Sequence, residues 1–99
     1  MVEPAFTSSK KRQLPRPFTF HWGGGQIVEE ATHVGQYHEP TIQLLEYADG
    51  SVTIRFCSYG HRGQFMRSPM MADADDLRGL KVALRATPRL RALLKEMVD

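Results

Sequence analysis

An Asp49-Gly50 pair stands between two runs rich in β-branched and aromatic residues, a pattern that predicts a β-hairpin over residues 41–59. Aspartate and glycine readily adopt the positive φ angles of a tight two-residue turn. With these two residues as the loop, one side of the hairpin is mostly apolar, and we expect that side to cover the core. It carries Gln43, Leu45, Tyr47, Val52, Ile54 and Phe56. The opposite side is mixed in polarity and is expected to be half exposed. It carries Ile42, Leu44, Glu46, Thr53, Arg55 and Cys57.

Further strands are predicted on both sides of this hairpin. The aromatic residues at positions 18, 20 and 22 alternate with smaller or polar residues, which predicts a strand that the three glycines at 23–25 end. Residues 26–34 fit both helical and strand spacing, and we interpret them as a strand. A short apolar and polar run at 64–67 predicts a last strand. The sheet is therefore expected to be antiparallel, with about four strands.

Two helices are predicted in the carboxy-terminal third. Leucines recur at helical spacing after Asp73, which fits the N-cap of a helix that ends near Ala86. Thr87 and Pro88 then resemble a new cap followed by proline at the first helical position. The expected apolar faces consist of Leu77, Leu80 and Leu84 in the first helix and of Leu90, Leu93, Leu94 and Met97 in the second. The sequence thus predicts an α+β fold in which an antiparallel sheet packs against two C-terminal helices.

Length and charge divide the chain into an arm and one domain. A chain of 99 residues suits a single domain, and we expect residues 17–99 to form it. Residues 1–16 combine prolines, serines and a Lys10-Lys11-Arg12 run with little apolar periodicity, which predicts a flexible basic arm. The net charge of +2 is a weak bias that neither requires nor forbids an anionic partner.

Cysteine content and hydropathy indicate the compartment. Cys57 is the only cysteine, so no intramolecular disulfide can form and a reducing compartment is expected. No apolar run approaches the roughly 18 residues that cross a bilayer, and the amino terminus lacks the features of a signal peptide. We therefore expect a cytoplasmic protein without a membrane partner.

Basic and aromatic residues interleave on the last predicted strands and in the loop between them. Such surfaces hold single-stranded DNA or RNA because aromatic rings stack on bases while guanidinium groups neutralise phosphates. The basic arm would add attraction to phosphates that is independent of base sequence. The alternative is an ordinary half-exposed sheet face with scattered arginines. The candidate nucleic-acid-binding residues are Arg55, Tyr59, Arg62, Phe65 and Arg67, together with Lys10, Lys11 and Arg12 of the arm.

A second class of function is a protein-interaction or assembly module. Met66, Met70 and Met71 lie in or just after the last predicted strand, ahead of the helices. Methionine adapts readily to a partner surface, although filling gaps in the core is its commoner role. A small antiparallel sheet also leaves edges that a second copy would cover. A homodimer, or a complex with another protein, is the expectation of this hypothesis.

Metal binding and catalysis have weaker support in the sequence. Histidine and cysteine side chains form zinc sites, but the spacings here are not those of standard fingers. The residues concerned are His21, His33, His38, Cys57 and His61. A Cys57–His61 pair would need an orienting acid and an oxyanion loop, and neither is evident. The glycines at 23–25 lack the lysine of a phosphate-binding loop. We expect no cofactor and no enzymatic activity.

Overall fold

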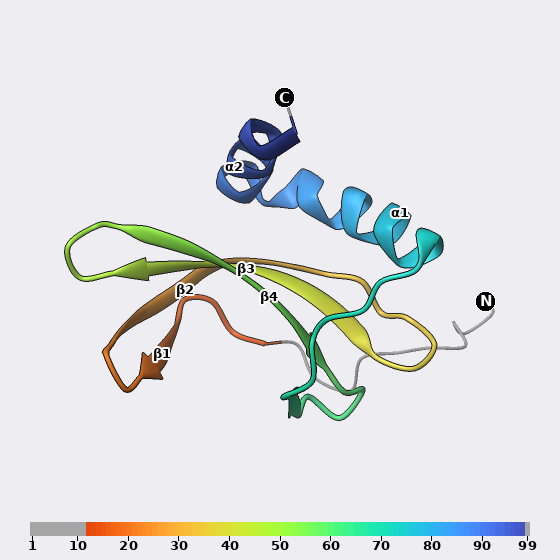
Figure 1. Cartoon of the computed structure of the whole chain (residues 1–99), viewed down its shortest axis with the longest axis horizontal. Coiled ribbons are helices and arrows are strands. Elements are labelled where there is room, and N and C mark those ends of the chain that lie inside the picture. The colour runs from red at the N-terminus through yellow and green to blue at the C-terminus, as the bar shows by residue number, and fades with distance from the viewer. Residues whose placement is uncertain (1–11, 99) are drawn as a thin grey trace.

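The computed structural model describes residues 12–98, which form a five-stranded sheet followed by two helices (Figure 1). The strands are β1 (Arg16–Phe20), β2 (Gly23–Thr32), β3 (Glu39–Tyr47), β4 (Val52–Tyr59) and β5 (Phe65–Met66). The helices are α1 (Ala74–Ala83) and α2 (Pro88–Val98), joined by a 3-10 turn over Leu84–Ala86. The strands lie in chain order, and each neighbouring pair is antiparallel. The expected α+β class is confirmed, with five strands in place of about four.

The hairpin turns at Asp49-Gly50 as predicted, but its loop holds three residues in place of two. Tyr47 donates its backbone N–H to the carbonyl of Ser51, and Gly50 takes up a φ of 87°. The added residue shifts the register by one position, and such a slip moves the side chains of one strand to the other face. The predicted hairpin faces are therefore wrong. The structure pairs Ile42 with Phe56, Gln43 with Arg55, Leu44 with Ile54 and Leu45 with Thr53.

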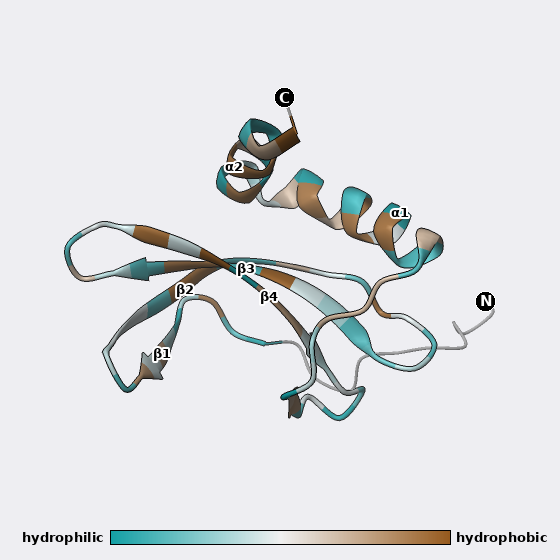
Figure 2. Cartoon of the chain, in the orientation of Figure 1, coloured by the Kyte–Doolittle hydropathy of each residue, from teal (hydrophilic) through white to brown (hydrophobic). Residues whose placement is uncertain are grey.

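The main core lies between the sheet and the two helices. Ile42 and Leu44 of β3 pack there against Leu80 of α1 and Leu90 of α2, and all four are buried. Partly buried residues surround them, namely Val28, Ile54, Leu84, Leu93 and Leu94. Burying one leucine stabilises a fold by about 1.5–3 kcal/mol, so these contacts hold the helices on the sheet. In Figure 2 hydrophobic and hydrophilic residues alternate along both helices, as one-sided packing requires.

The apolar faces of the two helices are shorter than predicted. Leu77 and Met97 were expected to face the core, yet they are 56% and 71% exposed. The core therefore takes up the stripes where the two helices meet, and only the beginning of the first stripe and the end of the second stay in solvent. Neither described helix combines the length and apolar character that a membrane span needs.

The two helices begin with different caps. Asp73 caps α1 as predicted, and it forms a capping box in which Asp73 and Asp76 each accept the backbone N–H of the other. α2 begins at Pro88 as predicted, but the Thr87 hydroxyl donates to Leu84 and does not cap it. The carboxylate of Glu29 in β2 instead accepts hydrogen bonds from the first backbone N–H groups of α2, those of Arg89 at 3.2 Å and of Leu90 at 2.8 Å. This cap fixes α2 to the sheet.

The face of the sheet opposite the helices, here called the open face, carries a second, smaller core. Phe18, Ile27 and Leu45 are buried there, with Phe20 and Tyr47 packed around them. The glycines at 23–25 do not end β1, as the sequence had indicated, because they belong to β2 and pair with β1. A Cβ atom at Gly25 would lie only 2.1 Å from the Glu46 carbonyl oxygen, so the close approach of β2 and β3 requires glycine at this position.

Candidate functional site

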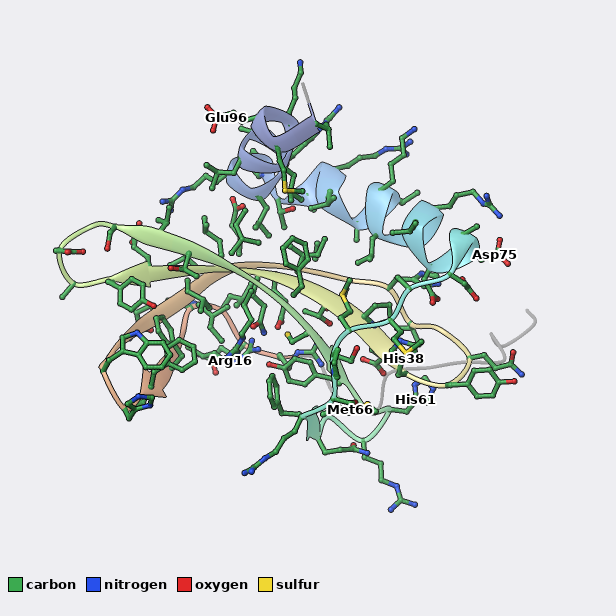
Figure 3. The ribbon with its side chains drawn as sticks, in the orientation of Figure 1. Arg16, His38, His61, Met66, Asp75 and Glu96 are labelled. Atoms are coloured by element: carbon green, nitrogen blue, oxygen red, sulfur yellow. The ribbon has the colours of Figure 1, made fainter. Side chains whose placement is uncertain are left out.

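A cluster of polar side chains occupies the middle of the open face. The Glu30 carboxylate accepts hydrogen bonds from Arg12 at 3.1 Å, from Arg16 at 2.7 and 3.1 Å, and from Gln43 at 2.6 Å. The Tyr59 hydroxyl accepts from Arg16 and Gln43 at 3.1 and 2.9 Å. Arg16 belongs to β1 and Tyr59 to β4, so the sheet must curl for their side chains to meet (Figure 3). The cluster therefore ties the two sides of the curled sheet together.

Electrostatics keep this cluster in its charged form at neutral pH. Burial by itself would raise the pKa of Glu30, but hydrogen bonds from Arg16 and Gln43 and the charges of Arg12 and Arg16 outweigh burial and lower it. The pKa of Arg16 is raised, because its bonds to Glu30 and Tyr59 outweigh burial in the opposite sense. Two arginine charges are thus committed to interactions within the protein.

A second ionic contact joins two loops at one end of the sheet. The fully buried Glu39 carboxylate lies 3.1 Å from Nδ1 of His61 and 3.7 Å from a guanidinium nitrogen of Arg12. Nε2 of His61 lies 3.2 Å from the carbonyl oxygen of Gln36. Both ring nitrogens therefore face acceptors, and these bonds, first that to Gln36 and then that to Glu39, raise the pKa of His61. The His61 ring thus joins the β4–β5 turn to Glu39 at the start of β3 and to the β2–β3 loop.

An aromatic–arginine cluster, made up of Phe20, Trp22, Arg55 and Phe65, lies beside these polar groups. The rings of Phe20 and Trp22 stack with centroids 4.6 Å apart and an interplanar angle of 13°. The guanidinium carbon of Arg55 lies 5.8 Å from the Phe20 centroid and 5.0 Å from the Phe65 centroid. Its Nε donates to Gln43 at 2.7 Å, which fixes the plane of the guanidinium group. The register shift in the hairpin places Gln43, in place of the expected Leu44, opposite Arg55 on this face.

The aromatic–arginine cluster is well exposed and adjoins an open groove. Trp22 is 67% and Phe65 48% exposed. The groove has a volume of about 400 Å³ and lies between the β1–β2 turn and the β3–β4 turn. It is lined by Trp22, Gly23, Gly24, Tyr47, Ala48, Asp49 and Ser51. Hydrogen bonds from Ser51 lower the pKa of Asp49, so the groove has one charged acceptor at its rim.

The structure brings some of the predicted nucleic-acid-binding residues together and removes others from the surface. Arg55 and Phe65 are in contact, and Arg62 and Arg67 are exposed in the β4–β5 turn and just after β5. Tyr59 was expected to stack on bases but is 6% exposed, because the guanidinium of Arg12 lies 3.9 Å from its ring centre. Tyr59 is a packing residue, and its assignment to the site is wrong.

The predicted basic arm overlaps the described chain only at its end. Lys10 and Lys11 lie outside the described residues. Arg12 and Arg16 are described, and both bind carboxylates of the sheet, so their side chains belong to the folded domain. The prediction missed Phe20 and Trp22 as site residues. Their signal was present, since three aromatic residues within five positions precede three glycines, but a strand pattern alone does not show that one end of the strand is exposed.

Comparison with known proteins gives no assignment. No protein-family model, curated protein or solved structure matches the chain. The chemistry of the open face therefore carries the functional argument.

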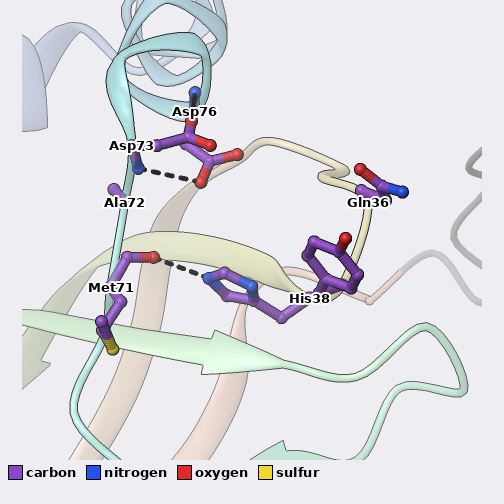
Figure 4. A pocket seen from close by; sticks show the side chains of 7 residues that line it. Gln36, His38, Met71, Ala72, Asp73 and Asp76 are labelled. Atoms are coloured by element: carbon purple, nitrogen blue, oxygen red, sulfur yellow. Dashed lines mark hydrogen bonds between the residues drawn. The ribbon is translucent and has the colours of Figure 1, made fainter.

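A second pocket, of about 320 Å³, lies where the β2–β3 loop meets the start of α1 (Figure 4). Nε2 of His38 lies 2.6 Å from the carbonyl oxygen of Met71, and Asp73 and Asp76 are occupied by the capping box. The His38 ring is thus used to join the β2–β3 loop to the segment before α1, and the two aspartates are used to begin the helix. Its geometry explains how α1 is anchored.

The predicted methionine interface is only partly exposed. Met71 is 76% exposed at the second pocket, whereas Met66 in β5 and Met70 are partly buried. The candidate metal ligands are dispersed. His33 lies near Asp76, His38 contacts Met71 and His61 contacts Glu39, and within residues 12–98 no three His, Cys, Asp or Glu side chains gather as a metal site. Burial raises the pKa of the Cys57 thiol, which disfavours the reactive thiolate.

Proposed function

We propose that this chain is a non-catalytic binding module that holds single-stranded nucleic acid on its open face. The observation that carries the proposal is the aromatic–arginine cluster, where Arg55 lies between two phenylalanine rings next to the exposed Trp22. Aromatic side chains stack on successive bases whatever their sequence, and arginine both stacks and contacts phosphate. The groove beside Trp22 offers space for a further base.

The distribution of ion pairs supports this choice of surface. Arg12 and Arg16 are neutralised by Glu30 and Glu39, so they offer little charge to a partner. Among residues 12–98, no ion pair involves Arg55, Arg62 or Arg67. These three positive charges stay available to phosphates, and they lie on β4, in the β4–β5 turn and after β5. A nucleic-acid strand whose phosphate backbone follows this side of the sheet would release its counterions as it binds.

Binding of labelled single-stranded DNA and RNA, followed by fluorescence anisotropy at two salt concentrations, tests the proposal. Trp22→Ala should weaken affinity by roughly tenfold or more, because stacking of one base contributes about 1–3 kcal/mol. Arg55→Ala should weaken affinity and make the logarithmic salt dependence shallower by roughly 0.7 for each lost phosphate contact. Arg55→Lys separates the two roles of arginine, since lysine keeps the charge but loses the planar stacking surface.

Two matched controls lie away from the open face. Tyr37→Ala removes an aromatic ring that is 81% exposed in the β2–β3 loop, and Arg91→Ala removes an exposed guanidinium from α2. Both should leave affinity and salt dependence unchanged. The proposal fails if the native chain binds no single-stranded oligonucleotide at low salt, or if the controls weaken binding as much as the changes at Trp22 and Arg55.

The cellular setting of this proposal is the cytoplasm, where single-stranded RNA is a natural ligand and Cys57 would stay reduced. The absence of catalysis is also part of the proposal. Incubation with single- and double-stranded substrates, with and without divalent ions, should leave their length unchanged, and any cleavage would contradict it.

A further inference from the structure

The outer edge of β4 is unpaired over most of its length. β4 pairs with β3 throughout, whereas β5 covers only Ser58 and Tyr59. Backbone groups of an antiparallel strand point alternately to either side. Because Ser51 bonds to Tyr47 in β3, and Gly60 bonds across the β4–β5 turn, the even-numbered residues point away from β3. The N–H and C=O groups of residues 52, 54 and 56 therefore face outward, with no strand beside them in the described part of the chain.

This edge has little of the usual protection against pairing, since the only charged residue of β4, Arg55, packs against Phe20 and Phe65. Proteins commonly place charges, prolines or bulges on exposed edge strands, and β1, at the other edge of the sheet, carries Arg16 and Pro17. The three residues of β4 whose backbone groups face outward, at positions 52, 54 and 56, are all apolar. The side chains of Val52 and Phe56 are 38% and 46% exposed. Both helices pack mainly over β2 and β3, so they cover Ile54 in part and leave Val52 and Phe56 exposed.

We propose that β4 of a second copy of this chain pairs with β4 across a two-fold axis at Ile54. In this antiparallel register Ile54 lies opposite the partner's Ile54, and Val52 lies opposite the partner's Phe56. The three residues of each copy whose backbone groups face outward then form three hydrogen-bonded pairs with the other copy. Both copies use the same surface, as in any isologous dimer. On the helix side of the sheet, the exposed valine and phenylalanine side chains become neighbours and bury one another.

The same register also fits on the open face, which is the reason to favour a second copy over an unrelated strand. Arg55 lies opposite the partner's Thr53, so no like charges are directly opposed. Cys57 lies opposite the partner's Ser51, and these small partner residues leave room for the packing of Arg55 on Phe65. The dimer joins the two sheets into one of ten strands, and it does not depend on nucleic-acid binding.

Sedimentation velocity of the native chain over a range of concentrations tests this dimer. The native chain should be dimeric at micromolar concentration. Val52→Lys should weaken the dimer by roughly tenfold or more, because it places an ammonium group at the pairing line beside the partner's Phe56. Val82→Lys is the matched control, since Val82 is 56% exposed on α1, away from the edge. A native chain that stays monomeric at high micromolar concentration overturns the proposal and leaves the edge to a strand of another protein.

Disulfide trapping tests the register without a charge at the edge. In a Cys57→Ser background, Ile54→Cys places two thiols opposite each other in a hydrogen-bonded pair, where Cα atoms about 5.5 Å apart can be bridged. Oxidation should give a covalent dimer, whereas Val82→Cys should give none. Two results would overturn the proposal, because each means that the dimer forms through another surface. One is a native dimer that does not form this cross-link, and the other is a dimer that Val52→Lys and Val82→Lys weaken equally.

Discussion

Replacing Glu30 with alanine should destabilise the fold strongly, because this carboxylate ties β1 to the rest of the sheet. It is 6% exposed and balances two arginines, Arg12 and Arg16, whose side chains are 13% and 21% exposed. Removing one partner of a buried ion pair costs about 3–5 kcal/mol, since the remaining charge is left uncompensated. Both arginines keep some contact with water, and Arg12 keeps Glu39 as a neighbour. We therefore expect a loss near the lower limit, about 3 kcal/mol.

A loss of this size is easily measured. Domains of this length have unfolding free energies of about 5–15 kcal/mol, and a loss of about 3 kcal/mol lowers the melting temperature by roughly 12–24 °C. Urea and thermal unfolding followed by circular dichroism would report it. Glu96→Ala is the matched control, because Glu96 points into solvent from α2 (Figure 3), and its change should stay within about 0.5 kcal/mol. A loss below about 1 kcal/mol for Glu30→Ala would refute the reasoning, since it is the size expected of an exposed pair.

Three further predictions concern the core and the pH dependence. Leu90→Ala should lower the free energy of unfolding by about 2–5 kcal/mol, as Leu90 is fully buried, while Leu77→Ala, at a position that is 56% exposed, should change it little in the same urea titration. The pKa of His61 is raised from 6.5, so the stability that His61 contributes is complete below pH 6.5 and is lost as the pH rises through the raised value. The urea midpoint of unfolding should fall over this range, and His61→Gln should flatten the fall. The pKa of Glu30 is lowered from 4.5, so its contribution is present above that pH and is lost as pH falls through the lowered value, and Glu30→Gln should remove that acid-dependent loss.

Local signals in the sequence predicted the elements better than their register. The Asp49-Gly50 pair marks the turn, and helical spacing with a capping aspartate marks α1. A glycine with positive φ suits both a two-residue turn and a three-residue loop, so the pair does not determine how β3 and β4 align. That single residue decides whether Gln43 lies beside Arg55 or beside Phe56, and hence which face carries the polar cluster. Loop length is settled by packing over the whole sheet, which a local pattern does not contain.

The candidate site was predicted only in part, because the sequence shows how many charges a chain has but not which ones are already paired. Arg12 and Arg16 stand in a basic stretch that favours a solvated arm, yet their partner Glu30 lies 18 and 14 positions further along. Arg55 and Arg67 look no different in the sequence, and in the fold they form no ion pair with any described residue. The charge that a surface offers to a phosphate is what remains after its internal ion pairs are made. On the open face, what remains is arginine beside exposed aromatic rings, and this is why we propose a single-stranded ligand there and not a duplex, whose bases are not open to stacking.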